Sequence, residues 1–216
     1  YTLAYSGQSQ DRHNPFLGCQ CTVVVAITDA TIEALITDIA QSQEGRFVVK
    51  VTNITDSYTA FVGNALADIA VIQDMDYPYT FRLTATDGLA ALKKEEYSND
   101  GTLYEGLETY ITHLARVFSK LIYVDNTFFP DGDELFRTLI DWHDVEHDDP
   151  VTATSDPFLT TWVDNKAFHK ITATGERTAL SCMDVLTHLL KPFGARIMQM
   201  EGIFWIEQIS LRTATT

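Results

Sequence analysis

The sequence is short of basic residues and has no long apolar run, and each shortage argues against a class of protein. Only 15 of the 216 residues are Lys or Arg, against 30 Asp or Glu, so the formal net charge is −15. A surface that grips nucleic acid needs clustered Lys and Arg. No apolar stretch approaches the length that spans a membrane, and no signal-peptide pattern stands at the N-terminus. The chain does not begin with methionine, which fits a fragment, a processed product or the ordered part of a longer protein.

The acidic charge has two interpretations. The first is solubility, because a net charge far from zero keeps proteins apart. The second is a surface that must lie near DNA without holding it, such as the lining of a conduit. Composition does not separate the two. With 45% hydrophobic and 21% charged residues the chain is globular in composition, and its length suffices for one large domain or two small ones.

The sequence contains few cysteines, and their number is odd. Cys19 and Cys21 stand two residues apart on a predicted strand, so both side chains lie on the same face. Cys182 lies on a predicted helix among apolar neighbours. A zinc site would require a second pair of ligands beside the first two. We therefore expect three buried free thiols, which fits assembly in a reducing compartment.

The clearest local pattern is a strand that runs directly into a capped turn of helix. Residues 79–86 alternate between apolar and polar side chains, the period of a half-buried strand. The spacing then becomes helical over residues 89–93. Gly88 permits a sharp turn between the two elements, and Thr86 or Asp87 supplies an oxygen for a free N–H of the first turn.

The rest of the first half predicts strands around one amphipathic helix. Residues 1–18 are polar and turn-rich and predict an irregular lead-in. Asp29 or Thr31 can cap the helix that follows the first strand. The helix shows the i, i+3, i+4, i+7 spacing of an apolar stripe at Ile32, Leu35, Ile36 and Ile39. The other predicted strands cover residues 19–28, 46–53 and 58–64.

Helical patterns dominate the second half. Apolar spacing predicts helices over residues 103–118, 135–140 and 178–191, and a C-terminal hairpin over residues 195–199 and 203–209. Pro192 and Gly194 end the last helix, and Glu201-Gly202 fits a tight turn. The fold class is therefore α+β: a mostly antiparallel sheet or partial barrel with covering helices. We divide it into a β-rich domain with one helix at residues 1–93 and a helix-plus-hairpin region at 94–216.

A faint internal repeat runs through the helical region. The run Thr-His-Leu at residues 112–114 recurs at residues 187–189, and Phe118 matches Phe193 at the same offset of 75 residues. The repeat indicates a duplicated helix-plus-hairpin module. Chance matches between leucine-rich helices are the alternative.

Two stretches contain residue types that bind metals, but neither has the spacing of a known metal-binding motif. His143 and His147 are four residues apart, but a zincin helix has Glu directly after the first histidine, and Asp144 stands there. Asp131-Gly-Asp133 resembles the start of a calcium loop without its later oxygen ligands. We interpret the histidine stretch as an acidic loop and the aspartates as helix-capping acids.

Other candidates have simpler explanations. His113 and His188, at matched helix positions, are expected to face solvent or the core edge. Burial in a core or an interface is the default for Trp142, Trp162 and Trp205, although together they could form a sugar-binding platform. A glycosidase-like carboxylate pair stays open. Because no nucleophile elbow, phosphate-binding glycine loop or paired-cysteine module is present, we predict no catalytic, cofactor-binding or metal-binding residues and no cofactor.

Residues 77–93, Tyr77-Pro-Tyr-Thr-Phe-Arg-Leu-Thr-Ala-Thr-Asp-Gly-Leu-Ala-Ala-Leu-Lys93, resemble tail-tip structural proteins of bacteriophages, especially those of Bacteroidetes hosts. Three other stretches are similar to the same proteins: residues 14–19, Phe61-Val-Gly63 with Asp68, and residues 179–207. Together they cover most of the chain. The resemblance implies a baseplate or tail hub that forms a ring around the DNA channel. Such proteins are structural, so no catalytic residues are carried over and the chain is expected not to be an enzyme.

The resemblance also implies partners and a location. The partners would be copies of the same chain in a closed ring, a trimer first and a hexamer second, together with neighbouring tail and baseplate proteins. DNA would pass through without specific binding. The protein would belong to the virion tail after assembly in the host cytoplasm. The alternatives are a distal tail ring protein, a tail-associated glycan hydrolase with an Asp/Glu pair, and a module that binds host sugar through exposed Trp and Tyr.

Overall fold

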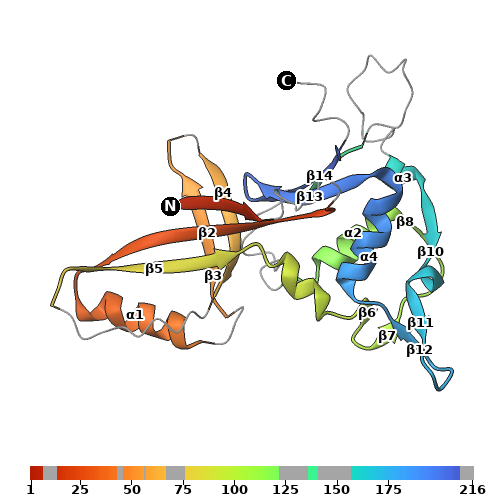
Figure 1. Cartoon of the computed structure of the whole chain (residues 1–216), viewed down its shortest axis with the longest axis horizontal. Helices are drawn as coiled ribbons and strands as arrows, with labels where there is room; N and C mark the ends of the chain where they lie inside the picture. Colours follow the sequence, from red (N-terminus) through yellow and green to blue (C-terminus); the bar gives the residue numbers. More distant parts are fainter. Residues whose placement is uncertain are drawn as a thin grey trace, which may run out of the picture.

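The computed structural model of the chain describes residues 1–6, 14–42, 46–55, 57–66, 76–121, 136–140 and 157–209. The molecule is elongated, with a lobe of long strands and one helix at one end and a mainly helical lobe at the other (Figure 1). Within the described ranges, no helix has the length and apolar character needed to cross a bilayer.

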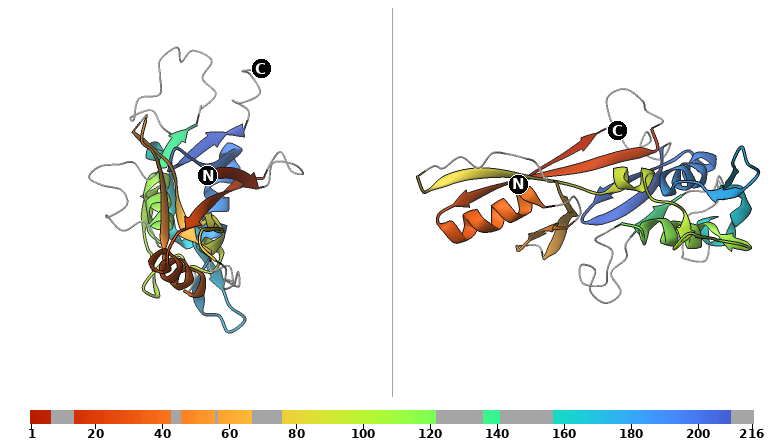
Figure 2. Two further views of the ribbon diagram at one scale, coloured as in Figure 1. Left: turned by 90° about the vertical axis from the view of Figure 1, so that its left-hand side faces the viewer. Right: turned by 90° about the horizontal axis from the view of Figure 1, so that it is seen from below.

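One large, curled sheet runs through both lobes (Figure 2). Its strands follow the order β3-β4-β5-β2-β13-β14-β9, and β1 pairs with β2 beside this path. The ladders are antiparallel except for β13 with β2 and β14 with β9. The predicted class, α+β with a mostly antiparallel partial barrel, is confirmed. The strands are β1 (Thr2–Ser6), β2 (Phe16–Ile27), β3 (Val48–Asn53), β4 (Tyr58–Ala65), β5 (Tyr79–Thr86), β9 (Phe136–Leu139), β13 (Ala195–Met200) and β14 (Ile203–Gln208).

The remaining elements are short apart from the helix α1. Three two-stranded ladders, β6–β7, β8–β10 and β11–β12, surround the helical lobe. The helices are α1 (Ala30–Gln41), α2 (Tyr110–Phe118), α3 (Pro157–Thr160) and α4 (Cys182–Leu190), with 3-10 turns η1 (Leu89–Lys93), η2 (Asn165–Phe168) and η3 (Lys191–Phe193). The short strands are β6 (Ser98–Asn99), β7 (Thr102–Leu103), β8 (Leu107–Thr109), β10 (Trp162–Asp164), β11 (His169–Ile171) and β12 (Arg177–Ala179).

The strand β5 and the turn after it form as their pattern predicts. Phe81, Leu83 and Ala85 are buried, while the residues between them face outward. Gly88 adopts φ = 76°, a backbone conformation that other residues rarely tolerate. The Oδ1 atom of Asp87 accepts the N–H of Leu89 at 3.1 Å. Asp87 is thus the acceptor for the first turn of η1.

The helix α1 covers the inner face of β2 and β5. Asp29 caps it, because its carboxylate accepts the N–H groups of Thr31 and Ile32. Ile36 and Ala40 are buried against the sheet. Leu35, which belongs to the predicted stripe, is instead exposed.

Two expectations for the first half and the middle of the chain were wrong. The lead-in at residues 1–18 contains β1 and the start of β2, because β1 pairs with β2 and its alternate residues Leu3 and Tyr5 pack against the core. The helix expected from residue 103 begins only at Tyr110. The preceding residues form β7 and β8, which pair with β6 and β10. Partners distant in sequence decide these strands.

Two expected helices further along also change. Residues 136–139 form β9, a strand parallel to β14, and Phe136 stacks on Phe118 at 5.0 Å between ring centroids. The last helix begins at Cys182, four residues later than expected, because residues 177–179 pair with β11. The C-terminal hairpin is confirmed, with Glu201 and Gly202 both at positive φ in its turn.

The main core draws on both sides of the predicted boundary at residue 93. It packs Val62 and Leu92 with Leu114, Leu186 and Phe204. The helices α2 and α4 of the proposed repeat contact each other. The hairpin of the first repeat falls mostly outside the described residues, so the duplicated module stays a prediction.

Candidate functional site: a buried tyrosine–histidine cluster

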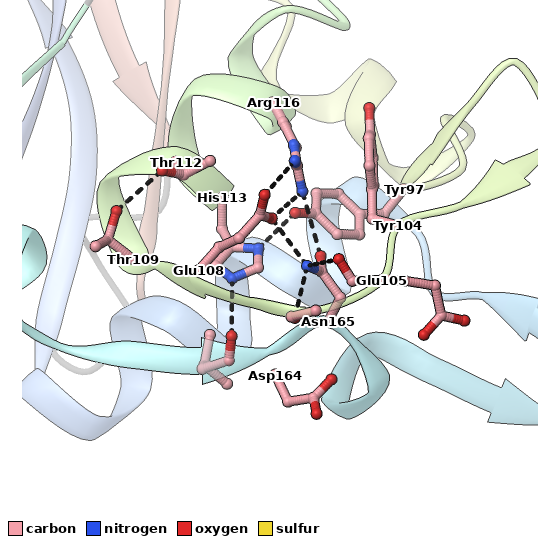
Figure 3. Close-up of polar contacts among 12 residues, drawn as sticks. Tyr97, Tyr104, Glu105, Glu108, Thr109, Thr112, His113, Arg116, Asp164 and Asn165 are labelled. Carbon is pink, nitrogen blue, oxygen red and sulfur yellow. Dashed lines mark hydrogen bonds and ion pairs between the residues drawn. The ribbon is translucent and has the colours of Figure 1, made fainter.

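A group of polar side chains that bind one another lies beneath α2 (Figure 3). Tyr97 comes from the loop after η1, and Glu108 from the middle of β8. His113 and Arg116 belong to α2, and Asn165 begins η2. Tyr97, His113 and Asn165 are buried. These segments are brought together only by the tertiary fold.

Local structure aims each side chain at the cluster. His113 and Arg116 are three residues apart on α2, so they share one side of the helix. Glu108 pairs with Val163 in the β8–β10 ladder, and its side chain points away from the outer face of that ladder. The backbone N–H of Asn165 donates to the carbonyl of Gly106 at 2.9 Å. The turn into η2 therefore fixes the Asn165 amide under the helix.

Tyr97 and His113 form the innermost contact. The Tyr97 hydroxyl lies 2.5 Å from Nδ1 of His113, and Nε2 lies 3.4 Å from the carbonyl oxygen of Val163. A carbonyl can only accept, so Nε2 carries the proton and the Tyr97 hydroxyl donates to Nδ1. Burial lowers the pKa of His113 and raises the pKa of Tyr97. Both side chains are neutral at physiological pH.

Glu108 and Arg116 form the outer part of the cluster. The guanidinium binds the carboxylate through both terminal nitrogens, and its central carbon, Cζ, lies over the Tyr104 ring, 3.9 Å from the ring centroid. Asn165 adds a hydrogen bond from Nδ2 to Glu108 Oε2 at 2.8 Å. Partial burial acts to raise the pKa of Glu108, but the hydrogen bonds from Asn165 and Arg116 hold it below its usual value.

The cluster binds its own members together. The two ring nitrogens of His113, the carboxylate of Glu108 and the Asn165 amide each contact another part of the chain. Hydrogen bonds to charged groups are stronger than hydrogen bonds between neutral groups. The Glu108 carboxylate accepts such bonds from Arg116 and Asn165, which belong to other segments of the chain. The arrangement suits a clamp that holds β8, α2 and η2 in one position.

The cysteines lie where the sequence predicts, and the histidines only in part. All three thiols are free and buried, and burial raises the pKa of Cys19 to about 12 and of Cys182 to about 11. His188 is exposed as expected. His113 was expected at the surface or core edge but is fully buried, because the Tyr97 hydroxyl and a carbonyl satisfy both of its nitrogens.

The other sequence candidates are dispersed. Trp162 is 59% exposed, while Trp205 is partly buried and donates from Nε1 to the Met200 carbonyl at 3.1 Å. Within the described ranges, no three His, Cys, Asp or Glu side chains group as a metal site would require. Several candidates lie outside the described residues: Asp131, Asp133, Trp142, His143 and His147.

Sequence reasoning missed most of the cluster. Tyr97, Glu108, Arg116 and Asn165 carry no short-range signal, since Asn165 lies 57 residues from Glu108. The one available hint was the basic Arg116 between the apolar Ala115 and Val117 on the helix. Comparison of the chain with protein-family models, with curated proteins and with solved structures found no match.

Proposed function

We propose that this protein is a structural subunit of a bacteriophage tail tip, a baseplate or tail hub that forms a ring of copies around the DNA channel. The proposal starts from residues 77–93, whose sequence resembles tail-tip proteins. In the fold this stretch is β5 followed by the junction into the helical lobe. The observation that carries the proposal is the form of the molecule: an elongated subunit with open sheet edges and a fixed junction between its lobes (Figure 1).

The junction is held by a buried carboxylate. Asp87 Oδ2 accepts the N–H of Cys19 at 2.5 Å, and the N–H of Asp87 donates to the Cys19 carbonyl at 3.0 Å. The same side chain accepts from Leu89. One residue therefore binds β2 and η1 together. A ring subunit that receives contacts at both ends benefits from a connection that does not bend.

The sheet offers edges for assembly. Among the described strands, β1 pairs only with β2, and β3 ends the sheet. Open strand edges are where another chain adds most readily. The edge strand β3 carries the exposed Lys50, and its ladder is irregular because β4 has an extra residue, Ala60, opposite Val51 and Thr52. A charged side chain on an edge discourages strand addition. The edge at β1 has neither a bulge nor a charged residue.

The charge suits a channel component. A net charge of −15 repels the DNA phosphates and opposes retention of DNA at the wall. A strongly basic lumen in the assembled ring would contradict this part of the proposal. The protein then acts through assembly, and no side chain is assigned a catalytic role.

Light scattering of the purified protein, with negative-stain images, tests the proposal. We expect a closed ring, with three copies for a hub. Six copies would favour the distal tail ring protein. A monomer at every concentration up to the solubility limit would contradict ring formation in solution. Glycan-binding and hydrolysis assays would then follow.

A further inference from the structure

The outer face of β1, β2 and β5 contains no acidic residue. It is the face opposite α1, and the ladders place Val24 beside Arg82 and Ala26 beside Thr80. We call it the hydroxyl face. Its members, alternate residues along the three strands, are Thr2, Ala4, Ser6, Gln20, Thr22, Val24, Ala26, Thr80, Arg82, Thr84 and Thr86.

The hydroxyl face differs from the rest of this acidic chain. The chain has 30 Asp and Glu, yet only Arg82 brings a charge to this face. Val24, near its middle, is 58% exposed. Burying an unpaired carboxylate costs free energy, whereas Thr, Ala and Val can be covered without that penalty. The face is therefore suited to contact with protein.

A second surface lies on the β8–β10 ladder. Its register pairs Trp162 with Thr109 and Asp164 with Leu107, all on the face away from the core. We call these four residues the tryptophan face. Leu107 is 60% and Trp162 59% exposed. The register makes Leu107 and Trp162 diagonal neighbours across the ladder, and tryptophan is among the residues that contribute most to binding.

The two faces lie at opposite ends of the molecule. Figure 1 places β1, β2 and β5 toward one end of the long axis and β8 and β10 at the other, and Figure 2 agrees. They are also complementary in charge, since Arg82 is the charged residue of one and Asp164 of the other. Two different complementary surfaces on one chain produce head-to-tail contacts, which close into a ring when the rotation permits.

We propose that the hydroxyl face of one copy binds the tryptophan face of the next copy. The inference rests on the proposed ring-forming function and names its contact. Val24 would lie against the apolar side chains of Leu107 and Trp162, and Arg82 would pair with Asp164. The contact is heterologous, so each copy uses both faces, one toward each neighbour.

Mixing two variants tests this geometry directly. Val24→Glu places a carboxylate on the hydroxyl face, and Trp162→Ala removes the apolar anchor of the other. Each variant alone should lose assembly, with a rise of about thirtyfold or more in the dissociation constant. In an equimolar mixture, the intact tryptophan face of the Val24→Glu variant can bind the intact hydroxyl face of the Trp162→Ala variant. We expect a dimer of one copy of each, twice the 24.2 kDa mass of one chain.

A matched control is Thr102→Glu, a charge placed on an exposed strand residue of the β6–β7 hairpin, which should assemble as wild type. Rings that persist in both face variants would overturn the contact and leave the proposed function standing. A wild-type chain that stays monomeric would overturn both. Loss of glycan retention in Trp162→Ala with intact rings would instead favour a sugar site at the tryptophan face.

A cysteine cross-link gives a second readout. A chain with both Val24→Cys and Leu107→Cys should form disulfide-linked ladders on oxidation, since the native thiols are buried. A chain with Ile54→Cys and Leu107→Cys is the control, because Ile54 is 90% exposed but lies outside both faces. Equal cross-linking of the two chains would overturn the proposed contact.

Discussion

The side chain of Gln199 is predicted to be one of the strongest stabilising groups in the sheet. It is 1% exposed, and its amide acts as a short piece of strand between β13 and β4. Nε2 donates to the Val62 carbonyl at 2.7 Å, and the Val62 N–H donates to Oε1 at 3.4 Å. The N–H of Ala65 donates to the Phe47 carbonyl of the neighbouring chain segment. Along an antiparallel strand, every second residue points its N–H and C=O toward the neighbouring strand. Val62 is three residues before Ala65, so its backbone N–H and C=O point away from β3. The amide of Gln199 is what satisfies them.

Replacing Gln199 with leucine keeps the volume and removes both hydrogen bonds. Each buried backbone group left without a partner costs about 1–3 kcal/mol, and the added apolar burial returns roughly 1 kcal/mol. We expect the free energy of unfolding to fall by about 1–5 kcal/mol, a large part of the roughly 5–15 kcal/mol of a typical domain.

Urea denaturation followed by circular dichroism measures this loss as a lower midpoint at unchanged slope. Gln41→Leu, at the exposed end of α1, is the control and should stay within about 0.5 kcal/mol of wild type. If Gln199→Leu also stays within that margin, the amide is not what satisfies the Val62 backbone, and the reasoning fails.

Three further changes test other parts of the fold. Gly63→Ala places a methyl group 2.1 Å from the Thr86 carbonyl oxygen, so we expect a loss of about 3 kcal/mol and a melting temperature lower by about 6–12 °C in calorimetry. Burial raises the pKa of Asp87 from 3.8 to about 6. Between pH 3.8 and about pH 6 the folded chain therefore keeps a proton on Asp87 that the unfolded chain has lost. The free energy of unfolding falls by about 3 kcal/mol as the pH rises through this range. Asp87→Asn should lack this slope when urea denaturation is repeated across pH. Arg116→Met removes the partner of Glu108. Because this ion pair is partly exposed, we expect the free energy of unfolding to fall by about 1–2 kcal/mol. A double-mutant cycle with Glu108→Gln measures the interaction between the two side chains.

Each of these three predictions has an outcome that would contradict it. Gly18→Ala is the glycine control, because its methyl group meets only the rotatable Ser6 hydroxyl; equal losses for both glycines would contradict the steric argument. A pH slope that survives in Asp87→Asn would assign it to another group. The pKa of Glu108 lies below its usual value in the folded state, so its contribution is present above pH 4.5 and lost as pH falls. Additive changes in the cycle would mean that Arg116 and Glu108 do not act as a pair.

Much of the local structure follows from the sequence. The strand at residues 79–86, the Asp29 cap and the C-terminal hairpin each depend on spacing of apolar residues or on a residue whose conformation is special. These signals act over a few residues, so a single sequence contains them completely. The α+β class and the buried thiols follow from the same short-range information.

The strands β1 and β9 and the polar cluster were decided by the tertiary structure. Residues 136–139 carry an apolar pattern that fits a helix as well as a strand, and the open edge of β14 selects the strand. His113 looks like a surface residue until Tyr97 and the Val163 carbonyl surround it. Hydrogen-bond partners tens of residues apart leave no periodic trace in a sequence. The same reason keeps the hydroxyl and tryptophan faces hidden there, since each exists only after ladders align residues from separate strands.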